Sequence, residues 1–190
     1  ENKKDNSIRI ASVRAGNVIG GGDWSSNRII PDCVKAWSKN ETVLLRNPDS
    51  TRPWQHVLEP LSGYMLLASN LFKNNNLNGE SFNFGPPAEE NYSVMELVIE
   101  MGKHWPNIKW KQVSNKNQEN SESNLLKLNC DKALNKLKWK STLSFSQTIQ
   151  MTSEWYKNFF KNGTNIESIS YDQITQFIDI AKSKGIEWAL

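Results

Sequence analysis

Several residue types are scarce in this chain of 190 residues, and each scarcity excludes a class of protein. Its two cysteines, Cys33 and Cys130, lie far apart and outside any CxxC or Cys/His ligand spacing, which argues against a disulfide scaffold or a zinc site. We interpret them as reduced, buried thiols of a cytoplasmic protein. No apolar run approaches the ~20 residues of a membrane span, and the opening residues resemble neither a signal nor a transit peptide.

A large excess of charge of one sign is also missing. The chain has 23 basic and 20 acidic residues, a net charge of +3, and its lysines are spread along the sequence. The densest basic stretch, residues 103–140, includes Trp105, Trp110 and Trp139, which could form a stacking surface for nucleic acid. We favour a solvated surface of helices and strands, so neither a nucleic-acid nor a membrane partner is expected.

Three consecutive glycines form the most informative feature that the chain does have. Residues 8–14 alternate like a half-buried strand, and Gly20, Gly21 and Gly22 follow shortly after it. Glycines allow a positive φ and let backbone N–H groups approach a phosphate closely, while the alternative is a tight strand-to-helix turn with no ligand. A GxGxxG dinucleotide loop is excluded, because its third glycine position holds Ser25.

Hydrophobic periodicity predicts alternating helices and strands. Helical spacing covers residues 30–37, 60–72, 94–105, 131–137, 146–161 and 171–184, with starts at Ser26 or Asn27, at a Ser93/Glu96 capping box and at Asp131. Strand patterns cover residues 8–14, 42–45, 51–58 with a break at Pro53, 81–84 and 107–113, and a polar loop is expected over 113–123. The strands are too short and dispersed for a full parallel sheet. The chain is therefore α/β, and its opening strand is expected to belong to a sheet whose other strands are missing.

Five segments together indicate a family: RAGNVIGGGDW at 14–24, NRIIPDCVKAW at 27–37, TRPWQHVLEPLSGYMLLA at 51–68, FNFGP at 82–86, and residues 128–156. In this order they resemble the C-terminal half of the extended short-chain dehydrogenases/reductases that act on nucleotide sugars, most closely the dehydratase branch specific for CDP-glucose. The resemblance implies the last strand or strands of an NAD-binding Rossmann domain over residues 1–24. It also implies a small mixed α/β domain for the nucleotide sugar over 25–162, with returns to the Rossmann sheet. The resemblance does not extend to residues 163–190, where the helical pattern predicts a C-terminal helical extension.

The resemblance implies an activity that this chain could hold only in part. The family's dinucleotide loop is absent from this sequence. Its Tyr-x-x-x-Lys proton-transfer pair is absent too, because the residues four positions after the tyrosines are Ala68, Glu96, Phe160 and Thr175. We therefore predict no catalytic residue here and expect a fragment that is inactive alone. The intact protein is expected to be a cytoplasmic, homodimeric lyase that converts CDP-glucose to CDP-4-keto-6-deoxyglucose with NAD. The alternatives are a non-catalytic binding or assembly module, and an epimerase or dehydratase for another base.

The family's substrate-binding positions are matched residue by residue. Asn17, at the end of the opening strand, matches an asparagine that hydrogen-bonds the nucleotide sugar, and Val18 matches a position that touches NAD through its backbone. Arg28 matches a basic residue at the start of a helix, where guanidinium and helix N-terminus both favour a phosphate. Arg52 matches an arginine whose planar fork suits bidentate binding of a diphosphate.

Two further matches and three departures complete the comparison with the family. Asn83 matches the asparagine of a Tyr-Asn-x-Gly motif that closes the pocket, and Lys127 matches a residue near the nucleotide end. Pro53 replaces the usual acidic residue after the arginine, Glu59 stands where many relatives have aspartate, and Arg46 replaces a glycine of the dTDP-glucose branch. These departures favour cytidine as the base.

Four other residues invite a functional role, and for each a structural role competes. We interpret Arg14 as a strand residue paired within the protein, and His56 as a packed histidine rather than a general base. Trp24 and Trp54 fit the wall of a pocket and the core equally well.

Overall fold

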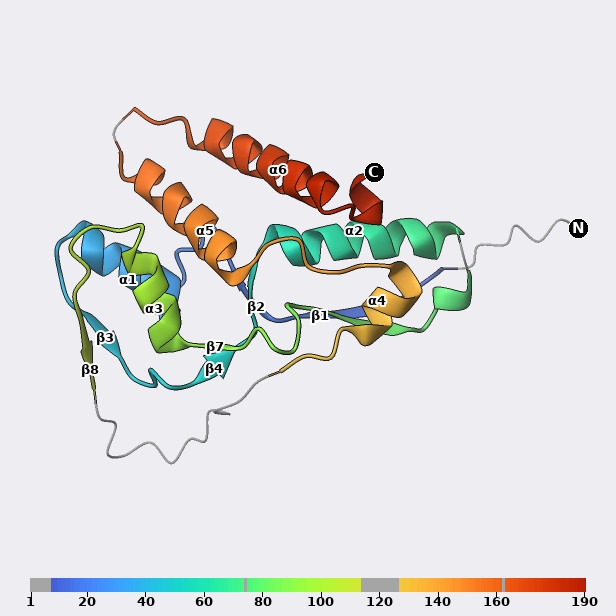
Figure 1. The fold of residues 1–190 in the computed structure, drawn as a ribbon, viewed down its shortest axis with the longest axis horizontal. Coiled ribbons are helices and arrows are strands. Elements are labelled where there is room, and N and C mark those ends of the chain that lie inside the picture. Colours follow the sequence, from blue (N-terminus) through green and yellow to red (C-terminus); the bar gives the residue numbers. More distant parts are fainter. Residues whose placement is uncertain (1–7, 74, 114–126, 162) are drawn as a thin grey trace, which may run out of the picture.

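A computed structural model describes residues 8–73, 75–113, 127–161 and 163–190, so most of the polar loop predicted over 113–123 lies outside the described residues. Figure 1 shows α1, α3, β3 and β8 at one end of the molecule, α4 toward the other, and α6 running alongside α5. The elements are β1 (Ser12–Ala15), β2 (Asn17–Ile19), α1 (Ile29–Ser38), β3 (Val43–Leu45), β4 (Thr51–Arg52), β5 (Trp54–His56), α2 (Leu58–Lys73), η1 (Asn75–Leu77), β6 (Ser81–Phe84), β7 (Tyr92–Ser93), α3 (Val94–Gly102), β8 (Trp110–Gln112), α4 (Asp131–Leu137), α5 (Phe145–Phe159), α6 (Ile166–Ser183) and η2 (Glu187–Ala189).

The opening strand changes partner at Gly16. β1 pairs in parallel with β6, and β2 pairs in parallel with β5. The amide of Gly16 donates to Phe84 O at 3.2 Å and the next amide donates to Pro53 O at 2.9 Å, so the switch occurs within one residue. A Cβ on Gly16 would lie 2.5 Å from Pro53 O, and only glycine fits. The single strand predicted over 8–14 is therefore wrong in its bounds and burial, because Ile8 and Ile10 are exposed.

The remaining strands also form pairs rather than one large sheet. β3 pairs in parallel with β8, and β4 pairs antiparallel to β7. The four two-stranded sheets of the described residues agree with the expectation that the strands are too short and dispersed for a full parallel sheet. The break predicted at Pro53 separates β4 from β5, as expected for a residue without an N–H donor.

The helix starts are partly as predicted. The capping box of Ser93 and Glu96 is present at the start of α3, and a second one, of Ser144 and Gln147, begins α5. The start predicted for α1 at Ser26 or Asn27 is wrong, because Arg28 is the N-cap residue and makes no side-chain capping bond. Asp131 is likewise the first residue of α4 rather than its cap. The last helix begins at Ile166, five residues before the predicted 171, because Asn165 caps it.

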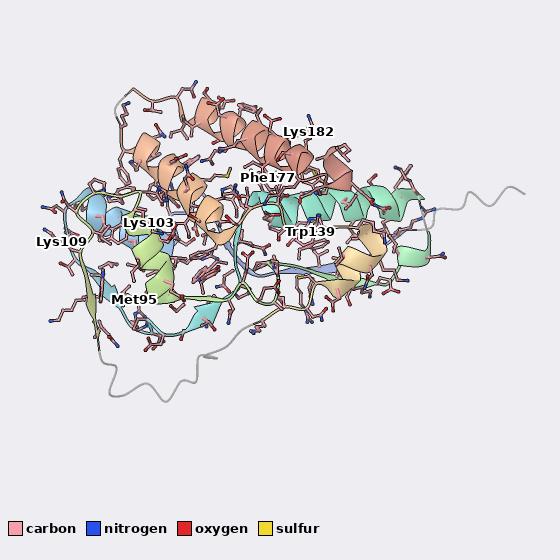
Figure 2. All side chains as sticks on the ribbon, in the orientation of Figure 1. Met95, Lys103, Lys109, Trp139, Phe177 and Lys182 are labelled. Atoms are coloured by element: carbon pink, nitrogen blue, oxygen red, sulfur yellow. The ribbon has the colours of Figure 1, made fainter. Side chains whose placement is uncertain are left out.

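Within the described part of the chain, three apolar clusters hold these elements together. The largest joins α1, α3 and α5 and includes Cys33, which is fully buried as predicted, whereas Cys130 is only half-buried. The second packs Trp139 between α2 and α4 (Figure 2), with the ring of Phe84 edge-on against it. The third packs Phe177 of α6 against α5 and α2, so the C-terminal extension is part of the core (Figure 2). None of the described helices is long and apolar enough to cross a membrane.

Burial of the tryptophans argues against a nucleic-acid surface. The exposed fractions of Trp105 and Trp139 are 7% and 1%, and only Trp110 has a substantially exposed ring, at 40%. Stacking of successive bases needs several aromatic faces at the surface. The described part of residues 103–140 therefore does not support this alternative, and Trp105 and Trp139 pack instead against apolar neighbours.

Candidate nucleotide-sugar site

A cavity of about 1020 Å³ opens beside the end of β2. Its walls come from β2, the start of α1, the end of β3, and β4 with β5. Four of the six predicted site residues line it: Asn17, Val18, Arg28 and Arg52. The fold brings them together because β2 pairs with β5, which places the segment that carries Arg52 next to the strand that carries Asn17. The volume lies at the upper end of the range typical of small-molecule sites.

The two predicted arginines differ in their surroundings. Arg52 is buried with an exposed fraction of 8%, and its Nη1 donates to Thr51 O at 2.8 Å. Arg28 is exposed and forms an ion pair with Asp23, with 3.1 Å between Nη1 and Oδ2. Burial by itself would raise the pKa of Asp23, but hydrogen bonds from Ser25 and the charge of Arg28 hold that pKa below its usual value. The carboxylate therefore stays charged and orients the Arg28 guanidinium.

The glycine corner is packed against protein rather than left open. A Cβ on Gly21 would lie 2.0 Å from Cδ2 of Trp155, and one on Gly20 would lie 2.8 Å from the side chain of Val57. Of the three glycines, only Gly22 has a positive φ, at 82°. Gly21 is required by a tight internal contact, as expected for a tight turn, while Gly20 lines the cavity and phosphate binding by this corner stays a prediction.

Helix α5 supports this corner through its aromatic side chains. The hydroxyl of Tyr156 donates to Asp23 O at 2.6 Å, and Nε1 of Trp155 donates to Oγ of Ser170, on α6, at 3.0 Å. Trp24 packs edge-on against Tyr156 and at a tilt against Phe159, outside the lining of the cavity. Core packing is therefore the role of Trp24.

Trp54 has both of the roles that the sequence left open. Its ring lines the cavity, and it is also buried, with Nε1 donating to Tyr92 O at 2.9 Å. That bond holds the ring between the cavity and the core, because a buried indole N–H needs an acceptor.

Two predicted site residues lie outside the cavity. Asn83 sits on β6 opposite Arg14 of β1, and its Nδ2 donates to Asn129 O at 3.0 Å. Lys127 is exposed, just before the segment that packs on Gly85. The partner switch at Gly16 explains the separation, because it places β6 beside β1 and the cavity beside β2. A role for both residues stays a prediction.

The surroundings of His56 and Arg14 do not support a functional role for either residue. His56 is buried, its Nδ1 accepts from the amide of Leu58 at 3.4 Å, and burial lowers its pKa to about 4. It is therefore a packed, neutral histidine, as predicted. Arg14 is exposed, and no ion pair joins it within the part of the chain that the structure describes, so its interpretation as an internally paired residue is wrong.

Glu59, a departure from the family pattern, links two segments of the protein by hydrogen bonds. Its carboxylate accepts the amides of Thr142 and Leu143, with distances of 2.8 and 2.6 Å to Oε1. Burial raises its pKa to about 7, against the effect of these bonds and of nearby Lys184. Glu59 therefore joins α2 to the segment before α5 and does not face the cavity.

Sequence reasoning did not assign several polar residues of the cavity to the site. They are Asp23, Asn27, Asp32, Arg46, Asn47 and Ser50. The available signal was position, because Arg46 and Asn47 directly follow β3, and polar side chains at the ends of short strands often face a site. Among the described residues, no group of three or more His, Cys, Asp or Glu side chains could hold a metal ion.

Solved structures with this architecture bind nucleotide sugars and dinucleotides. The UDP-glucose-4-epimerase of Stenotrophomonas maltophila, with bound NAD and formylated UDP-arabinopyranose, superposes with a TM-score of 0.67 over 80% of this chain and 48% of its own, at 16% identity. The dTDP-glucose 4,6-dehydratase of Bacillus anthracis, in complex with NAD, gives a TM-score of 0.63 over 77% of this chain and 44% of its own, at 19% identity. The chain has the fold of the C-terminal part of an extended short-chain dehydrogenase/reductase, about half of each of these solved chains.

A curated relative adds similarity in sequence to this similarity in fold. The CDP-glucose 4,6-dehydratase of Salmonella typhimurium is 39% identical over 160 residues, which cover 84% of this chain and 44% of the relative. The resemblance recognised from the five sequence segments is thereby confirmed. The chain spans less than half the length of this relative, and no protein-family model matches it.

Proposed function

We propose that this chain is the nucleotide-sugar-binding part of an NAD-dependent dehydratase that converts CDP-glucose to CDP-4-keto-6-deoxyglucose. The observation that carries the proposal is the cavity that gathers Arg52, Arg28 and Asn17, in a chain similar to a CDP-glucose 4,6-dehydratase. A dianionic diphosphate needs cationic donors with fixed orientation, and Arg52 is fixed by burial and Arg28 by Asp23. The amide of Asn17 offers donors and an acceptor to the sugar or diphosphate.

The start of α1 adds a second source of positive potential. No side chain caps this ten-residue helix, so the N–H groups of Ile29 and Ile30 in its first turn can bind a phosphate oxygen, whereas Pro31 has no N–H to offer. Arg28 is its N-cap residue, and both therefore act on the same region of the cavity. Binding energy from the diphosphate, far from the reacting carbons, would then orient the hexose.

NAD, when bound, would supply hydride transfer at the hexose. Of the residues in this chain, Val18 fits a contact with NAD, because it is half-buried and lines the cavity next to Asn17. The segment that carries most of the NAD contacts, and the Tyr-x-x-x-Lys pair, would lie outside this sequence. Two features favour such a segment beside β1. In the described residues β1 pairs only with β6, and α2 exposes Leu61, Met65 and Phe72 along one face.

Two further features of the intact protein belong to this proposal. We place it in the cytoplasm, in keeping with Cys33 and Cys130, which are both free thiols. We also propose a homodimer, a state that the family resemblance implies.

Titration of the 190-residue chain by calorimetry tests the binding role. We expect CDP-glucose to bind more tightly than dTDP- or GDP-glucose. Replacing Arg52 with lysine should weaken CDP-glucose binding about tenfold, because lysine keeps the charge but loses the bidentate fork. Arg14→Ala is the matched control, since it removes an exposed arginine outside the cavity. Equal affinity of the wild type and Arg52→Lys would contradict the assignment of Arg52.

Turnover by a full-length protein that contains this sequence tests the catalytic half of the proposal. Such a protein should dehydrate CDP-glucose in preference to dTDP- or GDP-glucose, and the 190-residue chain alone should not. A preference for another base would contradict the assignment of cytidine. Dehydration by the chain alone would contradict the assignment of the proton-transfer pair to a missing segment.

A non-catalytic binding or assembly module is the second candidate. The absence of a Tyr-x-x-x-Lys pair from the sequence favours it. The two candidates differ in their response to an added dinucleotide-binding half. A dehydratase part should gain activity when that half is supplied, whereas a binding module should bind CDP-glucose with the same affinity and produce no 4-keto sugar.

A further inference from the structure

The polar lining of the cavity contains one cation whose role is still unassigned. Among the described residues its charged side chains are three arginines and two aspartates, so one net positive charge remains. Asp23 is already paired with Arg28, at 3.1 Å. Removal of Arg46 would leave this lining with no net charge opposite a dianionic diphosphate.

Arg46 is held in place by a second lining residue. It follows directly after β3, and its Nη2 donates to Oδ1 of Asn27 at 2.8 Å. Asn27 has a positive φ of 63°, a conformation that asparagine tolerates better than most residues, and it immediately precedes Arg28. The bond therefore ties the end of β3 to the start of α1, across the cavity wall.

Arg46 and Asn27 together offer hydrogen-bond donors to a ligand. A guanidinium has five N–H donors and no acceptor, and the bond to Asn27 uses one of its nitrogen atoms. Because Oδ1 of Asn27 accepts from Arg46, the amide nitrogen of Asn27 is the end that is left for a ligand. A patch of donors beside two other arginines suits a ligand group rich in acceptors and negative charge.

We propose that Arg46, positioned by Asn27, binds the diphosphate of the nucleotide sugar as a third arginine. The inference rests on the proposed nucleotide-sugar site and adds a residue at which, by the family resemblance, this chain departs from the dTDP-glucose branch. Asn27 is a positioning residue in this arrangement, because it acts by holding the guanidinium. The exposed side chain of Arg46 makes its contribution sensitive to salt, unlike that of buried Arg52.

Calorimetric titration of the 190-residue chain with CDP, CMP and UDP tests the assignment. Arg46→Ala should weaken CDP binding about tenfold and UDP binding equally, and it should weaken CMP binding less, because one phosphate is absent. Arg46→Lys should fall between the two. The difference between wild type and Arg46→Ala should shrink in 1 M salt, a response that a purely structural role would not produce. Arg14→Ala should bind CDP within twofold of the wild type.

Asn27→Asp keeps an acceptor for Arg46 and tests whether the charge of its guanidinium acts on the ligand. A carboxylate at this position should pair with the guanidinium and cancel its charge, so we expect a loss of CDP affinity at least as large as that of Arg46→Ala. Asn27 and Arg46 are exposed, and thermal unfolding of each variant should match that of the wild type.

The possible results separate this inference from the proposed function. If the wild type binds CDP and Arg46→Ala binds it within twofold of the wild-type affinity, the inference is overturned and the proposed function is not. A loss of CDP binding with UDP binding unchanged also overturns it, because Arg46 would then contact the base. Failure of the wild type to bind CDP overturns the proposed function, and the inference with it.

Discussion

Replacing Gly21 with alanine should destabilise the protein, because the new methyl group would overlap the indole of Trp155. The added Cβ would lie 2.0 Å from Cδ2, 2.1 Å from Cγ and 2.6 Å from Cδ1 of that ring, well inside van der Waals contact. The ring cannot move freely. It is buried, it is stacked on Phe159 at 10°, and its Nε1 donates to Ser170.

The expected cost follows from these contacts. Forcing one extra carbon into a packed site costs about 1–3 kcal/mol. Displacing the indole also breaks its hydrogen bond to Ser170, which adds about 1 kcal/mol. The free energy of unfolding should therefore fall by about 2–4 kcal/mol in Gly21→Ala. Because Gly21 adjoins Gly20 of the cavity lining, CDP affinity should fall as well.

Urea denaturation followed by circular dichroism measures this loss. Gly85→Ala is the matched control, since its Cβ would meet its nearest neighbour, Leu128, only at 3.4 Å. Its stability should stay within about 0.5 kcal/mol of the wild type. A double-mutant cycle with Trp155→Val isolates the contact, and the cost of Gly21→Ala should largely disappear in that background. An unchanged cost there, or a stable Gly21→Ala protein, would refute the reasoning.

The other predictions concern buried polar groups. The pKa of Glu59 rises on folding from 4.5 to about 7, so its stabilisation is fully present below pH 4.5 and is lost as pH rises through 7. One pKa unit corresponds to 1.36 kcal/mol, so the free energy of unfolding of the wild type relative to Glu59→Gln should fall by about 3 kcal/mol between pH 4.5 and 8. Urea denaturation at a series of pH values measures this difference, and a difference that does not change with pH would argue against a raised pKa of Glu59. Ser170→Ala should cost about 1 kcal/mol by leaving Nε1 of Trp155 without its acceptor, whereas Ser183→Ala, on the exposed side of α6, should be close to neutral in thermal unfolding.

Local rules account for the parts of this fold that the sequence predicts well. The capping box at Ser93 satisfies N–H groups within four residues, and the break at Pro53 follows from a missing donor, so both could be read without a tertiary structure. The start of α1 was misplaced because its first turn has no side-chain cap to mark it. The opening strand was misplaced because its burial depends on partners distant in sequence.

The sequence by itself determined the α/β class, the family resemblance and four site candidates that the structure places in the cavity lining: Asn17, Val18, Arg28 and Arg52. These follow from residue identities in ordered segments, which no packing can alter. Only the tertiary structure decided which residues meet. The partner switch at Gly16 separates Asn83 from Asn17, and the bond between Asn27 and Arg46 brings a third arginine to the cavity across 19 residues of sequence. Such contacts depend on strand pairing and chain reversal, which short-range patterns do not specify.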